Sequence, residues 1–232
     1  MIDFNRRQWD EADASFARAD LGWGRYTASS RYRRAEVAMA TGDYATAYRH
    51  LANLSEGIAS GSIPGTFAAF IPFGEGQLAR LEGLNQIASG YLQDALASDF
   101  ASKMDELRVQ ALAGLATMEG VSGSAKRARE LLGQCLNDDL LQFFMPLTMV
   151  IATLAELLVN ADAETAIELG ALAASYRNRS WFKAMYGPDE ARITTILDRA
   201  REEHGIPLPD VPADLTAAHA IAECREALAL IS

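Results

Sequence analysis

Apolar residues recur in this chain with the period of an α-helix rather than with the alternation of a β-strand. The stretch GDYATAYRHL, which begins at Gly42, shows the pattern most clearly. Tyr44 stands two residues after that glycine, and Ala47, Leu51 and Leu54 stand five, nine and twelve residues after it. Residues with this spacing lie on one face of a helix. The sequence therefore predicts a helix that begins just after Gly42 and packs through a stripe of small and medium side chains.

Four further copies of this stripe occur along the chain. The first alanines of the five copies stand at positions 12, 47, 88, 128 and 166, which are 35, 41, 40 and 38 residues apart. The other stripes are Ala12, Phe16 and Ala19 after Trp9; Ala88, Leu92 and Ala95 after Gly83; Ala128, Leu132 and Cys135 after Gly123; and Ala166, Gly170 and Ala173. A period of about 34 to 45 residues is typical of helix–turn–helix solenoids, in which stacked repeats bury faces that one repeat cannot bury alone.

The glycine before the stripe predicts a tight turn between two helices. Glycine adopts the left-handed conformation that ends a helix without steric cost, and an aspartate such as Asp43 can then cap the next helix. First helices are predicted before these turns, over residues 29–41, 74–82, 105–120 and 143–159. Because no alternating run calls for a strand, we predict an all-α fold, an α-α superhelix of stacked antiparallel helix pairs.

Two segments depart from the repeat. Residues 58–76 carry Pro64 and Pro72 and are predicted to loop out before the next helix restarts or kinks. Residues 206–212, IPLPDVP, form a predicted stiff connector between a helix at residues 188–204 and a last helix that folds back as a cap. The predicted domains are therefore a helical repeat array over residues 1–205 and a Pro-rich connector with a C-terminal capping helix over residues 206–232.

Composition and charge exclude several classes of protein. The chain has 232 residues, 50% of them hydrophobic, which is enough to bury a core, and its two cysteines cannot build a disulfide framework. The formal net charge of -10 disfavours nucleic acid and membranes as partners. The apolar run at residues 140–159 is interrupted by Gln142, Pro146 and Glu156, which favours a buried helix over a membrane span. No signal peptide is visible, and we predict a cytoplasmic protein.

No motif for catalysis or cofactor binding is found in the sequence. The glycines at residues 57–65 and 74–76 lack the lysine of a phosphate loop and the third glycine of a dinucleotide fingerprint. The histidines at positions 50, 204 and 219 form no strong metal-ligand pattern. Cys135 falls on a packing stripe, where a buried hydrophobe is expected rather than a nucleophile. We therefore predict no catalytic residue, no cofactor and no metal.

The repeats resemble a known family. Gly42, Asp43 and Tyr44 with Ala47 resemble the second half of the tetratricopeptide repeat, as do the copies at Trp9 and Gly83. More specifically, residues 108–133, RVQALAGLATMEGVSGSAKRARELLG, resemble the helical repeats at the C-terminal end of bacterial signal-transduction ATPases and transcription activators of the maltose-regulator type. The resemblance covers residues 7–173. It implies a tetratricopeptide-like scaffold or sensor module, with ATPase and DNA-binding parts elsewhere in a longer polypeptide.

A basic and aromatic cluster on a first helix is the first candidate for partner binding. It consists of Arg31, Tyr32, Arg33 and Arg34, of which Arg31, Tyr32 and Arg34 are the predicted binding residues. First helices line the inner wall of tetratricopeptide-like arrays, and arginine with tyrosine suits carboxylates and peptide ends. The structural alternative, with Tyr32 packed and the arginines solvated or paired with local acids, stays open.

The second candidate is a group of aromatic and basic residues near position 180. It consists of Arg177, Trp181, Phe182 and Lys183. Amphipathic aromatics beside basic side chains are typical interface anchors. Packing of the same residues in the core of a terminal helix is the alternative.

Together these features predict a non-catalytic protein-interaction or signal-sensing module of a bacterial signalling or transcription-regulator protein. Its partner would be a peptide, a protein segment or a small effector. Two alternatives stay open: a homo-oligomerisation scaffold that pairs through the N-terminal helix face, and an enzyme whose groove active site no motif reveals. Because eight residues before Trp9 are too few for a first-helix partner, we also expect the chain to begin within an array, or another subunit to cover this face.

Overall fold

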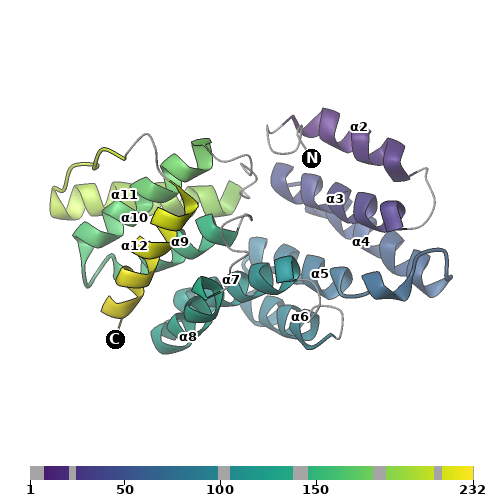
Figure 1. Ribbon diagram of the computed structural model, residues 1–232. Helices are drawn as coiled ribbons and strands as arrows, with labels where there is room; N and C mark the ends of the chain where they lie inside the picture. Colours follow the sequence, from purple (N-terminus) through teal and green to yellow (C-terminus); the bar gives the residue numbers. More distant parts are fainter. Residues whose placement is uncertain are drawn as a thin grey trace. The chain divides into compact units, whose positions relative to one another are not determined.

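The predicted all-α fold is confirmed. The computed structural model describes residues 8–20, 25–98, 105–137, 146–179, 187–211 and 216–231, and this part of the chain forms eleven α-helices, one short 3-10 helix and no strand (Figure 1). The elements are α2 (Trp9–Asp20), α3 (Arg25–Thr41), α4 (Tyr44–Ala59), η1 (Gly65–Phe67), α5 (Phe70–Leu81), α6 (Asn85–Ala97), α7 (Asp105–Val121), α8 (Ala125–Leu136), α9 (Pro146–Leu158), α10 (Ala163–Arg179), α11 (Gly187–His204) and α12 (Ala217–Leu230). Neighbouring helices pack in pairs, as α3 does on α4, α5 on α6 and α9 on α10.

Three turns between helices have the geometry that the repeated glycine predicts. Their glycines have positive φ: Gly42 at 79°, Gly83 at 77° and Gly123 at 87°. At the first turn, the N–H of Asp43 donates to the carbonyl of Ala38 over 2.9 Å and the N–H of Gly42 donates to that of Met39 over 3.2 Å. The same pair of bonds recurs at the other two turns. These are Schellman motifs, which satisfy the last carbonyls of one helix while the chain reverses into the next.

The predicted aspartate cap is confirmed at the first of these turns. The Asp43 carboxylate accepts a hydrogen bond of 3.0 Å from the N–H of Thr46, and hydrogen bonding to Thr46 lowers the pKa of Asp43. Asp162 caps α10 in the same way through the N–H of Thr165. Leu84 and Ser124, which precede α6 and α8, make no side-chain cap bond.

The small-residue stripes face the core. In α4, the side chains of Ala47, Leu51 and Leu54 are at most 1% exposed. The stripes of α6, α8 and α10 are buried in the same way. In α2 the prediction is wrong at one position, because Ala19 in the last turn is exposed while Ala12 and Phe16 are buried. The stripe therefore ends one turn early in α2.

The predicted loop at residues 58–76 is shorter than expected. Helix α4 continues to Ala59, and α5 begins at Phe70, so that Pro72 lies in the first turn of α5. A proline is tolerated there because the first N–H groups of a helix have no partner within the helix. The glycines at positions 74 and 76, where the predicted loop overlaps the predicted helix at residues 74–82, are buried within α5 where it packs against α4 and α6.

The chain divides into two compact units, Met1–Ala111 and Leu112–Ser232, with the boundary inside α7. In the second unit, α9 packs against α10 and α11, and α12 packs against α8, α9 and α10. The predicted helix at residues 188–204 and the last helix are confirmed as α11 and α12, and the described residues 205–211 connect from α11 in extended or irregular conformation. The capping role of α12 and the domain division at residue 205 stay predictions.

The apolar run at residues 140–159 contributes only a 13-residue helix, α9, to the described structure. No helix that the described residues form has both the length and the apolarity needed to cross a bilayer.

Candidate functional site

The predicted cluster on α3 is divided between the core and a set of ion pairs. The side chain of Tyr32 is buried, and its ring lies 4.7 Å from that of Phe70 and 6.0 Å from that of Phe73, measured between centroids. Such tilted aromatic contacts are typical of packing. Tyr32 therefore contributes to the core between α3 and α5.

Arg31 and Arg34 tie α3 to the helices beside it. Arg31 donates from Nε to Asp20 over 2.9 Å, and from Nη1 to the carbonyl of Asn53 in α4 over 3.0 Å. Arg34 forms a bidentate pair with Asp13 of α2, over 2.8 and 3.2 Å, and this hydrogen bonding raises the pKa of Arg34. The arrangement corresponds to the structural alternative for these arginines. Their role in partner binding stays a prediction.

Replacing both arginines by alanine is expected to loosen α2. The double variant Arg31→Ala, Arg34→Ala loses two partly exposed ion pairs between helices, worth about 1 kcal/mol in total. Amide hydrogen exchange in residues 9–20 should therefore become faster, while the helices that do not contact these arginines are unchanged. Arg127→Ala, which removes a pair confined to α8, is the matched control and should leave α2 unchanged. Unchanged exchange in α2 of the double variant would show that the ion pairs do not hold this helix.

The second predicted cluster is mostly outside the described residues. Trp181, Phe182 and Lys183 belong to residues 180–186, which are not described, and nothing is described of the Arg177 side chain, although its backbone continues α10. Their predicted role as interface anchors stays a prediction.

An exposed apolar row lies on α6 of the first unit. Leu84, Ile87 and Tyr91 are 47%, 54% and 36% exposed and share one helix face. Beside them, the Tyr48 hydroxyl donates to Glu82 over 2.8 Å, and burial together with this bond raises the pKa of Tyr48 to about 12. None of the cavities described below is lined by these residues.

A small cavity in the first unit lies beside the aromatic side chains of α3 and α5. It has a volume of about 170 Å³, and its lining includes Tyr32, Phe73 and Gln110. Its charged groups, Arg33 and Glu36, form an ion pair with each other, and the Glu36 side chain is only 3% exposed. The cavity is smaller than typical ligand pockets of about 300–1,000 Å³, and a paired charge gives it little attraction for an ion.

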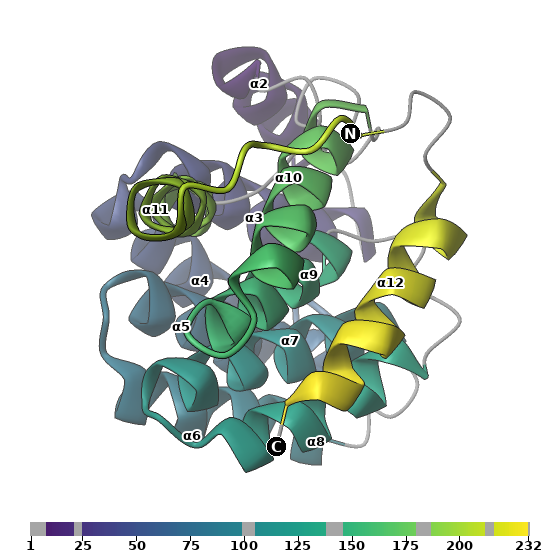
Figure 2. The ribbon, with the colours of Figure 1, turned by 90° about the vertical axis from the view of Figure 1, so that its left-hand side faces the viewer.

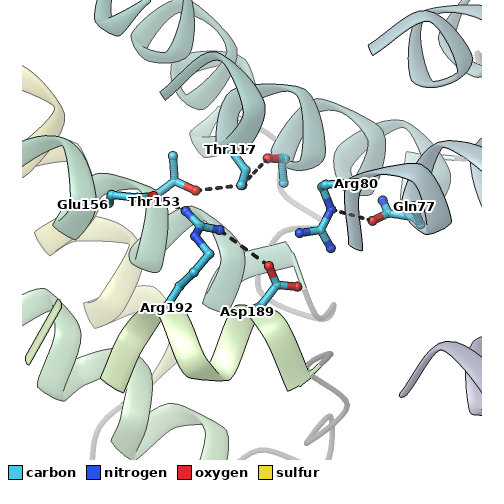
Figure 3. A network of polar contacts seen from close by, with 8 residues as sticks. Gln77, Arg80, Thr117, Thr153, Glu156, Asp189 and Arg192 are labelled. Carbon is cyan, nitrogen blue, oxygen red and sulfur yellow. Dashed lines mark hydrogen bonds and ion pairs between the residues drawn. The ribbon is translucent and has the colours of Figure 1, made fainter. Parts of the chain in front are cut away.

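A groove between α9 and α11 in the second unit is larger, at about 570 Å³, but its charged side chains are paired with one another or with neighbouring residues. Arg192 of α11 binds the carboxylates of Glu156 and Asp189 (Figure 3). Arg199 donates to Asn160 over 2.7 Å and to Glu203. Behind Glu156, α9 is joined to α7 by a buried hydroxyl pair, Thr117 and Thr153 (Figure 3). The polar groups of this groove therefore join helices of the unit together.

A second groove of the same unit combines an apolar floor with an acidic rim. It has a volume of about 500 Å³ and is lined by α10, α12 and the end of the connector. Figure 2 shows α10 beside α12, and the two helices contact each other. The floor includes Leu169, Leu172 and Ala227. The charged and titratable groups of the rim are Glu168, Asp210, His219, Glu223 and Glu226. We refer to this site as the α10–α12 groove.

Helical spacing brings these side chains to the groove. In α12, His219, Glu223, Ala227 and Leu230 follow one another at intervals of three or four residues and so share a face. Thr216 caps the start of α12, and its side chain accepts a hydrogen bond from the N–H of His219. On α10, Thr165, Glu168, Leu169 and Leu172 stand at positions i, i+3, i+4 and i+7 of one helix face, which gives the groove two helical walls.

The inward face of α12 fixes its position. Ala220 and Cys224 are fully buried, and burial raises the pKa of the Cys224 thiol to about 12, which keeps it protonated. Arg225 donates over 2.7 Å to the carbonyl of Leu136 at the end of α8. The groove is therefore built on a helix that is anchored to its neighbours.

The α10–α12 groove carries uncompensated negative charge. Four carboxylates line it, and the described residues of its lining include no lysine or arginine. His219 Nε2 lies 3.6 Å from Glu223 Oε1, and among the described residues Glu168, Asp210 and Glu226 make no hydrogen bond or ion pair through their side chains. The groove thus offers apolar contact surface surrounded by a negative field.

The groups whose pKa is shifted by burial lie apart from the cavities described above. Burial, then the charge of Arg34, lowers the pKa of His50, and burial raises that of Glu75. Neither residue lines any of these cavities. Within the described part of the chain, no group of three histidine, cysteine or carboxylate side chains could hold a metal ion.

No family model, curated protein or solved structure matches this chain. The resemblance to the tetratricopeptide-like repeats of maltose-regulator-type activators therefore stays a prediction that rests on the residues quoted for it.

Sequence reasoning did not find the α10–α12 groove. Its walls are about fifty residues apart in the sequence, and the acids on each wall are indistinguishable from ordinary solvent-exposed charge. The available signal was the row of Glu223, Glu226 and Leu230 on a helix whose opposite face carries small buried residues.

Proposed function

We propose that this protein is a non-catalytic interaction module that holds a segment of a partner protein in the α10–α12 groove. The observation that carries the proposal is an open groove of about 500 Å³ with an apolar floor and an uncompensated acidic rim. Its volume lies within the range of ligand sites, about 300–1,000 Å³. A groove walled by two helices suits the docking of a peptide through its apolar side chains.

Two further observations support binding over bond chemistry. Catalytic sites usually place groups of shifted pKa together in one cavity. The groups of shifted pKa named above are not brought together in any of the cavities described here. Of the two largest cavities, the groove between α9 and α11 has its charged side chains paired, whereas the α10–α12 groove leaves most of its charge unpaired among the described residues. If the family resemblance holds, the module would regulate an attached or associated signalling protein.

Selection of peptides on the whole protein tests this proposal. Peptides enriched from a random display library should bind in solution, as measured by fluorescence anisotropy. The variant Leu230→Asp, which places a charge on a side chain that is 52% exposed at the groove, should weaken their binding by about tenfold or more.

The variant Val121→Asp is the matched control. Val121 is 54% exposed and lines the groove between α9 and α11. It should leave binding unchanged. Loss of binding in Val121→Asp with retention in Leu230→Asp would move the site to the other groove, and the absence of any selected peptide would contradict the proposed function.

A further inference from the structure

We infer that the occupant of the α10–α12 groove is a cationic amphipathic helix, with an apolar stripe on the floor and lysine or arginine on its flanks. This inference rests on the proposed function. It names one class of partner, which complements both the apolar floor of the groove and the carboxylates on its walls.

The distribution of the carboxylates favours a ligand with positive charge on more than one side. Glu168 belongs to the α10 wall, Asp210 to the connector, and Glu223 and Glu226 to the α12 wall. A single ammonium group could reach only part of this rim. A helix that lies along the groove presents flanking side chains to both walls, because residues on either side of its apolar stripe point in different directions.

The floor favours an apolar stripe over a purely charged ligand. Leu169 and Leu172 are buried in the base of the groove, and Leu230 extends the apolar surface at the rim with half of its area exposed. Lysine and arginine side chains lie with their methylene stems on such surfaces while their charged ends reach carboxylates. Arginine can also bind a carboxylate through two parallel hydrogen bonds.

Charge complementarity disfavours the other macromolecular ligands. Phosphate backbones and anionic lipids would meet four carboxylates and, in the part of the lining that the structure describes, no lysine or arginine, on a protein whose net charge is -10. An acidic peptide would meet the same repulsion. A positively charged peptide is attracted at a distance as well as in contact.

Three synthetic helical peptides that share one leucine stripe test the inference. Their flanking positions carry lysine and arginine, glutamine, or glutamate, and each is titrated with the full chain by fluorescence anisotropy at low and high salt. We expect the cationic peptide to bind at least about tenfold more tightly than the neutral one, with an advantage that shrinks as salt screens the exposed charges.

The variant Glu223→Gln, Glu226→Gln should weaken binding of the cationic peptide by about tenfold and leave the neutral peptide unchanged. The control variant Glu56→Gln, Asp94→Asn removes the same net charge from exposed positions of α4 and α6 in the first unit. It should have little effect on either peptide. Equal weakening by both variants would mean that net charge, and not this rim, attracts the peptide.

The outcomes separate this inference from the proposed function. If the neutral peptide binds as tightly as the cationic one and Leu230→Asp weakens both, the charge inference is overturned and the proposed function stands. If spermine competes as well as the cationic peptide does, the apolar stripe is unnecessary and the inference is overturned. If none of the three peptides binds and the display selection also yields none, both proposals are contradicted.

Discussion

Replacement of Gly76 by alanine is expected to destabilise the first unit by about 2 kcal/mol, although alanine is the better helix former. A methyl group at position 76 of α5 would lie 2.7 Å from Cγ of Leu92 and 3.2 Å from its backbone nitrogen. Leu92 is fully buried in α6 and cannot turn outward. Overpacking of this kind costs about 1–3 kcal/mol, which outweighs the helix-propensity gain of about 1 kcal/mol.

Gly90→Ala is the matched control, because Gly90 lies on the exposed face of α6 with no atom within 4 Å of the added methyl group. At this position the substitution changes only the helix propensity, and we expect it to raise the free energy of unfolding by about 0.5–1 kcal/mol. Urea unfolding followed by circular dichroism measures both changes. Stabilisation of the protein by both substitutions would contradict the close approach of α5 and α6.

Replacement of Leu92 by alanine is expected to cost about 3 kcal/mol, the largest effect we predict for one side chain. Leu92 is fully buried, and truncation removes its contacts and leaves a cavity beside Gly76. The added methyl group of Gly76→Ala fills part of that cavity, so the double variant should be about 1 kcal/mol more stable than Leu92→Ala alone. If the double variant loses the sum of the two single losses in free energy of unfolding, measured by urea, the two residues are not in contact.

The repeat architecture could be predicted because it depends on short-range chemistry. Gly42, Gly83 and Gly123 have a left-handed conformation that other residues rarely adopt, and the stripe that follows each one has helical spacing. These signals act within about fifteen residues and so are visible in one sequence. The structure confirms the turns, and it confirms the stripes except at Ala19.

Helix α5 shows why local signals can mislead. Pro64 and Pro72 indicate a loop over residues 58–76, yet Pro72 lies in the first turn of α5, and the glycines at positions 74 and 76 accommodate leucines of other helices. A methyl group at Gly74 would lie 2.6 Å from Cδ2 of Leu51 in α4. A glycine that permits close helix packing cannot be told from a glycine that permits a turn by the sequence alone, because the difference depends on the neighbouring helices.

The candidate site was beyond the reach of the sequence for a related reason. The arginines at positions 31 and 34 suggested binding, but in the structure they pair with Asp20 and Asp13 of α2. The acids at positions 168, 223 and 226 are indistinguishable in the sequence from ordinary exposed charge, and the packing of α10 with α12 brings them to one groove. Tertiary contacts decide whether a charged side chain forms an ion pair within the protein or stays free to bind a partner. The sequence alone does not show which of the two applies.

Photo-crosslinking tests most directly that the α10–α12 groove is the docking site. A cationic amphipathic peptide with a benzophenone in its apolar stripe is bound to the whole protein and irradiated, and the modified residues are located by mass spectrometry. We predict crosslinks within residues 165–172 and 219–230, which are lost in Leu230→Asp. Crosslinks concentrated at residues 191–199, or within the first unit, would contradict this account.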